Sequence, residues 1–316
     1  MRMIRNREHL KSNDSKRIFF MKKSAVILFL ILGIFLSGCV ENATTEEKGD
    51  KIVVYTSVYP LYDFAKKIGA DTVQVENMVP PGVEPHDWEP SAQDILRLEK
   101  ADLFIYNGAG LEHWTEDVLL TLENKALVVT VASEGIPILQ ADGRSDPHIW
   151  LNPQYAKKEA ENIMKALCEV NPKQTTLYEE NFLAISKDFD LLDETLREVF
   201  SSTKRKDVIV AHEAFGYLCE AYGLRQIGIE GLEPNAEPSP KKMREIIEFA
   251  KEHTVTTIFF EELASAKVAE IIASEIGAAT AVLHPIEGLS EEQREKGDDY
   301  FSLMRENAAA LKDALG

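Results

Sequence analysis

Short apolar, β-branched runs alternate with amphipathic stretches along most of the chain. The run KIVVYTS at 51–57 is typical of a buried strand, and from Tyr59 onwards apolar residues recur at helical spacing. Parallel sheets covered by helices satisfy such an alternation, so we expect an α/β fold. The pattern predicts strands at 51–57, 72–78, 103–106, 126–131, 208–210, 226–230, 257–260 and 279–283, and helices at 59–68, 92–100, 114–122, 153–170, 214–222, 241–252, 267–276 and 299–315.

Residues 172–201 break this alternation. They contain no glycine and no proline after Pro172, and large apolar residues return every three or four positions. This spacing predicts one helix of roughly 28 residues, about 42 Å long at 1.5 Å per residue. We therefore expect two lobes, residues 51–171 and 202–316, each with a mainly parallel sheet flanked by helices and joined by this linking helix. One stiff helix as the bridge predicts a small tilt between the lobes.

The N-terminus has the pattern of a secretory signal. Lys22 and Lys23 precede the apolar run 25–36, which is too short for a comfortable membrane span. The stretch Leu36-Ser37-Gly38-Cys39 resembles a bacterial lipobox, in which the cysteine is lipidated. We expect a signal peptide at 1–39, a flexible tether at 40–50, and a chain exported and anchored to the outer face of the cytoplasmic membrane. The alternative is a plain membrane anchor with an incidental cysteine.

Charge and cysteine usage narrow the class of protein. After Cys39 the chain has 27 basic and 51 acidic residues, a net charge near −24. So acidic a surface argues against binding to nucleic acid or to anionic lipid headgroups. Cys168 and Cys219 lack any zinc-type spacing, so free thiols are favoured, with a single bridge as the alternative. We expect a monomer.

Histidines mark the candidate chemistry. His113 and His253 sit in polar surroundings and are expected to be exposed. Ligands of parallel α/β sheets bind at the carboxyl ends of the strands, and three or four neutral imidazoles make a tetrahedral zinc site. The alternative is that each histidine caps or packs locally. The remaining candidates each follow a predicted strand or lie in the loop beyond it: His86, His148, His212 and His284.

Four motifs in order along the chain carry a family resemblance: PHDWEPS at 85–91, DPHIWLNP at 146–153, AHEAF at 211–215 and GLEPNAEPSP at 231–240. From about Lys51 to the C-terminus the sequence resembles the zinc/manganese-type solute-binding lipoproteins of ABC importers, the ZnuA/TroA-like family or cluster A-I, some of which are grouped as cell adhesion proteins. The resemblance implies two α/β lobes bridged by one long helix. It also implies capture of a divalent transition metal outside the cytoplasm and delivery to an ABC permease with its ATPase.

The resemblance implies His86 and His148 as first-lobe metal ligands and His212 as a second-lobe ligand. Manganese-type members tend to have a carboxylate where His212 stands, so the imidazole favours zinc, with manganese as the alternative. The fourth position departs from the family pattern of an Asp. His284 falls near it, and Glu287 in the same loop or a water molecule is the alternative.

Two carboxylates, Glu213 and Glu262, are candidates for orienting the imidazoles, with exposed surface positions as the alternative. Because the ligands must be neutral, metal affinity is expected to fall as the pH drops through the histidine range near 6.5. We do not expect an enzyme. A zinc hydrolase with Glu213 as general base is the rival from another class, although the second histidine of HExxH is missing after His212. A surface adhesin with an incidental metal site is a third interpretation.

Overall fold

The computed structural model describes residues 51–316 except 142, 233, 235–237, 263 and 264. The expected signal peptide, the expected lipidation site Cys39 and the tether at 40–50 therefore lie outside the described residues. Part of the fourth motif, Glu233 and 235–237, lies outside them too. Among the described helices, none combines the length and the apolar character that a membrane crossing requires.

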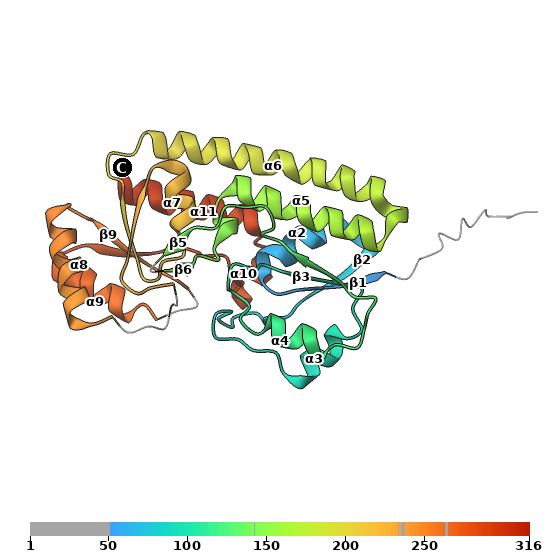
Figure 1. The fold of residues 1–316 in the computed structure, drawn as a ribbon. Coiled ribbons are helices and arrows are strands. Elements are labelled where there is room, and N and C mark those ends of the chain that lie inside the picture. The colour runs from blue at the N-terminus through green and yellow to red at the C-terminus, as the bar shows by residue number, and fades with distance from the viewer. Residues whose placement is uncertain (1–50, 142, 233, 235–237, 263–264) are drawn as a thin grey trace, which may run out of the picture. The chain divides into compact units, whose positions relative to one another are not determined.

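The first sheet has four parallel strands in the order β2-β1-β3-β4. Its strands are β1 (Ile52–Thr56), β2 (Val73–Asn77), β3 (Leu103–Tyr106) and β4 (Val128–Val131). Alternate residues face opposite layers, as the pleat requires. Val54, Leu103 and Ile105 pack with α2 (Tyr59–Gly69) and α5 (Pro153–Val170), whereas Phe104 packs with α3 (Ala92–Leu98) and α4 (Thr115–Thr121). Helices therefore cover both faces (Figure 1).

The second sheet repeats this arrangement. Its parallel strands have the order β10-β9-β7-β8. They are β7 (Asp207–Val210), β8 (Arg225–Gly228), β9 (Thr257–Phe260) and β10 (Ala279–Val282). As in the first sheet, the strand that comes first in the sequence is an inner strand and lies beside the third strand of its sheet. Val208, Val210 and Phe259 face α7 (Gly216–Tyr222) and α11 (Tyr300–Leu315). Ile209 and Ile258 face α8 (Pro240–Glu252) and α9 (Lys267–Ile276).

The linking helix is α6 (Thr175–Ser201), preceded by a 3-10 turn at Pro172–Gln174. It runs beside elements of both lobes (Figure 1). Phe189 on α6 meets Phe64 of α2 at a ring-centroid distance of 5.3 Å and Phe301 of α11 at 4.9 Å. The predicted fold of two parallel-sheet lobes with one long helix is confirmed. The helix's buried side chains are Tyr178, Ile185, Phe189, Leu192, Asp193, Leu196 and Phe200.

Short polar elements escaped the hydrophobic pattern. The helix α10 (Glu291–Lys296) has no apolar residue, and its ends are instead set by a capping box between Ser290 and Gln293 and by Gly297 in the left-handed region. The two-residue strands β5 (Gln140–Ala141) and β6 (Arg144–Ser145) form an antiparallel pair. Cys168 and Cys219 are free thiols, as expected.

Candidate metal centre

Three imidazoles and one carboxylate meet where the two sheets' carboxyl ends face each other. One nitrogen each from His86, His148 and His212 and one oxygen from Glu287 lie within 4.8 Å of one another. His86 lies between β2 and α3, and His148 between β6 and α5. His212 follows β7 and Glu287 follows β10. The structure thus brings together three of the four histidines singled out from the sequence.

The distances within this cluster fit a tetrahedral ion. His86 Nε2 and His212 Nε2 each lie 3.2 Å from His148 Nε2. Glu287 Oε1 lies 2.9 Å from His86 Nε2, 2.8 Å from His148 Nε2 and 4.0 Å from His212 Nε2. Zinc–ligand bonds of about 2.0–2.1 Å place tetrahedral donors about 3.3 Å apart. Four of these distances lie within about 0.5 Å of that spacing, and only the Glu287–His212 distance is clearly longer, so the four atoms are arranged for one shared ion.

The cluster is almost closed to solvent. His148 and His212 are 0% exposed, and Glu287 is 2% exposed. The side chain of His86 retains 8% exposure. Buried imidazoles and a buried carboxylate that face one another are costly unless they pair or bind a metal.

The local sequence explains how His148 is held. It precedes the 3-10 turn Ile149–Leu151, and Asn152 then caps α5 by accepting a hydrogen bond from the Gln154 N–H at 2.9 Å. Asn107, which follows β3, donates from Nδ2 to the Pro147 carbonyl at 2.9 Å. The His148 loop is thus fixed from both sides.

Two buried carboxylates orient the imidazoles. Asp146 Oδ1 lies 2.8 Å from His148 Nδ1 and also accepts the His148 backbone N–H at 3.0 Å. Glu261, directly after β9, hydrogen-bonds His212 Nδ1. A carboxylate at Nδ1 keeps the proton there, so that Nε2 can offer its lone pair to a metal.

The same contacts shift protonation equilibria. Burial lowers the pKa of His148, but hydrogen bonds with Asp146 and Glu287 outweigh it and raise that pKa to about 10. Burial opposes the charge of Glu287, yet His86 and His148 hold its pKa well below the usual range. Burial and the neighbouring charge of Glu287 raise the pKa of Glu84 to about 8. Without a metal, a proton on His148 therefore balances the Glu287 carboxylate.

His284 does not join the cluster, and Glu287, the alternative in the same loop, takes the fourth place. The Asn307 side chain of α11 holds the His284 backbone by accepting its N–H and donating to its carbonyl, both at 2.7 Å. The imidazole faces Glu262 at 3.7 Å and Glu306 at 3.6 Å. The chain then turns at Ile286, whose φ is 61°, and this turn aims Glu287 inwards.

The orienting residues were partly missed. Glu262 lies beside His284 and accepts a hydrogen bond from Gln293 at 2.8 Å, while Glu261, one residue earlier, reaches His212. The expected partner Glu213 packs closely on Gly228. A Cβ atom at position 228 would lie only 2.1 Å from the Cγ of Glu213. Asp146 could have been found from its place two residues before His148. His113 and His253 are exposed, as expected.

Comparison with known proteins places this geometry in context. Residues 54–314 match the family model ZnuA, described as "Zinc-uptake complex component A periplasmic". The high-affinity zinc uptake system protein ZnuA of Bacillus subtilis is 39% identical over 308 residues, which cover 91% of this chain and 97% of that protein.

A second relative is the zinc-binding lipoprotein AdcA of Streptococcus pneumoniae. It is 35% identical, and the match covers 92% of this chain but only 61% of AdcA. The crystal structure of its Zn(II)-bound ZnuA-like domain superposes with a TM-score of 0.76 at 37% identity, covering 84% of this chain and 99% of that domain.

A second similar structure is the laminin-binding protein Lmb of Streptococcus agalactiae, described as bifunctional with adhesin and metal transporting activity. It superposes with a TM-score of 0.78 at 33% identity and covers 84% of this chain and 100% of that one. The similarity therefore extends over both lobes and the linking helix.

Proposed function

The chain belongs to the ZnuA family of periplasmic zinc-uptake components, and from this premise we propose that it captures zinc outside the cytoplasm and delivers it to an ABC importer. The periplasmic component of a zinc-uptake complex is a solute-binding protein and not an enzyme, so the zinc hydrolase interpretation is not supported. Metal capture is the role that a nearly closed cluster of four donors can perform.

We propose His86, His148, His212 and Glu287 as the metal ligands. The observation that supports this most strongly is the set of near-tetrahedral distances among their four inward atoms. Three nitrogen donors and one oxygen suit zinc, whereas manganese favours sites richer in oxygen donors. Zinc-binding relatives support the same choice.

The remaining parts of the proposal concern the rest of the chain. Residues 1–39 would act as the signal peptide, with Cys39 lipidated, 40–50 as the tether and the membrane's outer face as the location. Residues 51–171 and 202–316 would be the two lobes, with 172–201 linking them. The partners would be a permease and its ATPase, which bind a monomer. The zinc-uptake relatives support the extracytoplasmic location and the transporter partners, and the lipoprotein AdcA supports a lipid anchor.

Elemental analysis of the chain purified without chelator tests the proposal. We expect about one zinc per chain, and a lower zinc content in His212→Ala, because the second lobe then offers the cluster no imidazole. His113→Ala is the matched control, since His113 is 52% exposed at its side chain and lies outside the cluster. Equal zinc content in both variants, or excess manganese displacing the zinc, would contradict the proposal.

A further inference from the structure

The segment 285–300, here called the strap, leaves the second sheet but docks on the first lobe. At its start the Trp150 Nε1–H donates to the Pro285 carbonyl at 2.7 Å, and the Tyr59 N–H donates to the Glu287 carbonyl at 3.2 Å. Both donors belong to the first lobe. Glu287 is thus fixed by first-lobe atoms, although it follows a second-lobe strand in the sequence.

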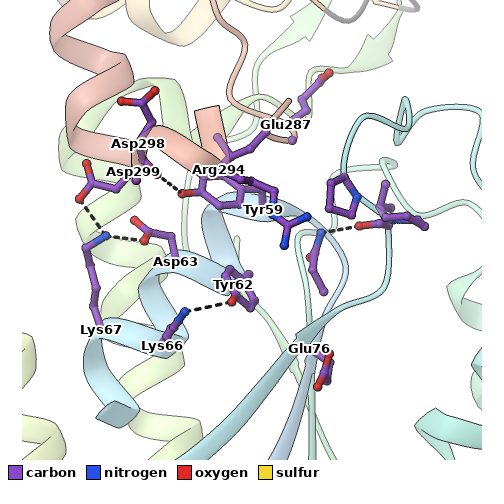
Figure 2. A pocket seen from close by; sticks show the side chains of 17 residues that line it. Tyr59, Tyr62, Asp63, Lys66, Lys67, Glu76, Glu287, Arg294, Asp298 and Asp299 are labelled. Atoms are coloured by element: carbon purple, nitrogen blue, oxygen red, sulfur yellow. Dashed lines mark hydrogen bonds and ion pairs between the residues drawn. The ribbon is translucent and has the colours of Figure 1, made fainter. Parts of the chain in front are cut away.

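The far end of the strap is tied to the same lobe. The Tyr59 hydroxyl donates to the Asp298 carbonyl at 3.4 Å, and Lys67 pairs with Asp299 at 3.0 Å. The Tyr300 hydroxyl donates to the Trp150 carbonyl at 2.7 Å. Residues of α2, of the strap and of 76–81 line a cavity of about 690 Å³. In Figure 2 the Glu287 carboxylate points away from the other labelled side chains of this cavity.

The backbone at Ile286, between the hydrogen bonds to Pro285 and Glu287, is strained. Ile286 has a φ of 61° and is 1% exposed. A β-branched residue with positive φ is a rare outlier that persists only where its surroundings fix it. The hydrogen bonds to Pro285 and Glu287, on either side of Ile286, supply that constraint.

The strap's side-chain hydrogen bonds to the rest of the second lobe lie mainly away from the stretch that carries Glu287. In α10, Gln293 bonds Glu262 at 2.8 Å and His284 at 3.3 Å, and at the strap's end Asp299 accepts the Ser302 N–H at 2.8 Å. His212, by contrast, lies two residues after β7 and is oriented by Glu261, the residue after β9. The four proposed ligands therefore divide three to one between the lobes, and not two to two.

We propose that Trp150 is a positioning residue for metal binding. Its indole N–H holds the Glu287 loop on the first lobe, so that His86, His148 and Glu287 form a preassembled set of three ligands. His212, carried by the second sheet, completes the shell when the lobes tilt. This inference rests on the proposed function, because it assigns a role within the same metal site.

Trp150→Phe tests it, because the phenyl ring keeps the edge-on contact with His148, at 5.7 Å between centroids, and removes only the N–H and part of the ring. Outer partners of metal ligands contribute about 10- to 100-fold in affinity. We expect zinc binding to weaken about tenfold and the visible spectrum of the cobalt-substituted protein to shift as it does in Glu287→Gln. Trp114→Phe, a buried tryptophan packed with Phe104, is the matched control and should change neither.

The double variant Trp150→Phe/Glu287→Gln gives the decisive comparison. If Trp150 acts through Glu287, the double variant binds zinc no more weakly than Glu287→Gln alone. Losses that multiply, or an unchanged cobalt spectrum in Trp150→Phe, would overturn the positioning role and leave the zinc site standing. Failure of the unaltered chain to bind zinc would overturn both.

A folding defect in Trp150→Phe would be visible by circular dichroism. Tyr300→Phe then replaces it, because this change removes only the hydroxyl that donates to the Trp150 carbonyl. We expect a smaller loss of zinc affinity with the same direction of spectral shift. A Tyr300→Phe protein that matches the unaltered chain in both measurements would contradict the proposal.

Discussion

The two lobes share one strand order but use it differently. In the second lobe, His212 lies two residues after β7 and Glu261 directly after β9. These are the neighbouring inner strands where the direction of winding reverses. This switch point is the usual binding crevice of such sheets. In the first lobe the corresponding strands β1 and β3 are followed by Ser57 and Asn107, and the imidazoles come from loops after the outer strands β2 and β4.

In the first lobe, the residues at the switch point hold the loop of His148 and are not themselves proposed ligands. Glu112 accepts the backbone N–H groups of Asn107 at 2.8 Å and Gly108 at 2.9 Å, and it also accepts the Ser57 hydroxyl. Asn107, held in this way, donates to the Pro147 carbonyl next to His148. The comparison teaches that strand order fixes the edge at which ligands meet, but not which loops supply them.

Replacing a ligand should give the largest effect. Structural zinc sites with four ligands bind with roughly 10–16 kcal/mol, so one ligand contributes about 2.5–4 kcal/mol, or about 100- to 1,000-fold in affinity. His148→Ala should weaken zinc more than His212→Ala does, because His148 Nε2 lies within 3.2 Å of both other imidazoles and of Glu287. Competition titration with a zinc chelator measures both. A larger loss of zinc affinity in His212→Ala than in His148→Ala would contradict this expectation.

The pH should have the next largest effect. The pKa of His148 is raised to about 10 in the metal-free chain, so its imidazole is protonated below that pH and zinc must displace the proton. One displaced proton weakens binding tenfold per pH unit, or about 300-fold from pH 7.5 to pH 5. Zinc affinity should therefore depend on pH up to about pH 10, whereas the sequence alone suggested a dependence only near pH 6.5. Calorimetry in buffers of different ionisation enthalpy counts the released protons, and none released at pH 7.5 would contradict the expectation.

Neutralising the orienting carboxylates should have a smaller effect, about 10- to 100-fold in zinc affinity. Asp146→Asn should cost more than Glu261→Gln, because Asp146 accepts both the ring and the backbone N–H of His148. Chelator competition measures both variants. Equal losses would show that the two lobes orient their imidazoles equally well.

The smallest effect is expected in the apolar layer between the second sheet and α8 and α9. Ile272→Val should lower the free energy of unfolding by about 0.5–1.5 kcal/mol, since Ile272 is fully buried there. Zinc affinity should stay unchanged because this layer and the metal cluster share no residue. Urea unfolding measures the change in stability, and zinc titration of the same protein measures the affinity. A loss of affinity would show that packing in this lobe reaches the site.

Sequence patterns predicted most of the fold because burial imposes periodicity. The long helix followed from apolar spacing between Leu177 and Phe200, and it was found at Thr175–Ser201. The helix α10 was missed because its six residues are all polar and only its caps define it. The wider linking-helix boundaries and the lipidation of Cys39 stay predictions.

The cluster was predictable where a proposed ligand follows a strand closely or lies in a recognisable motif. His212 follows its strand, and His86 and His148 lie within recognisable motifs, so all three were found. Glu287 could not be chosen over His284, because the decision lies in the positive φ of Ile286, which no hydrophobic pattern records. Glu261 was missed by one residue, a difference that the end of a strand does not reveal.

Exposure differs among the four proposed ligands, and this has a kinetic consequence. The side chain of His86 is 8% exposed, whereas the other three are at most 2% exposed. His86 is carried by the connection between β2 and α3, so a bound ion would exchange with solvent past this loop and not through the buried sheet ends. The residence time of the ion would then depend on how often this loop opens. A membrane partner that shifts it could speed unloading without altering the chemistry of the other three donors.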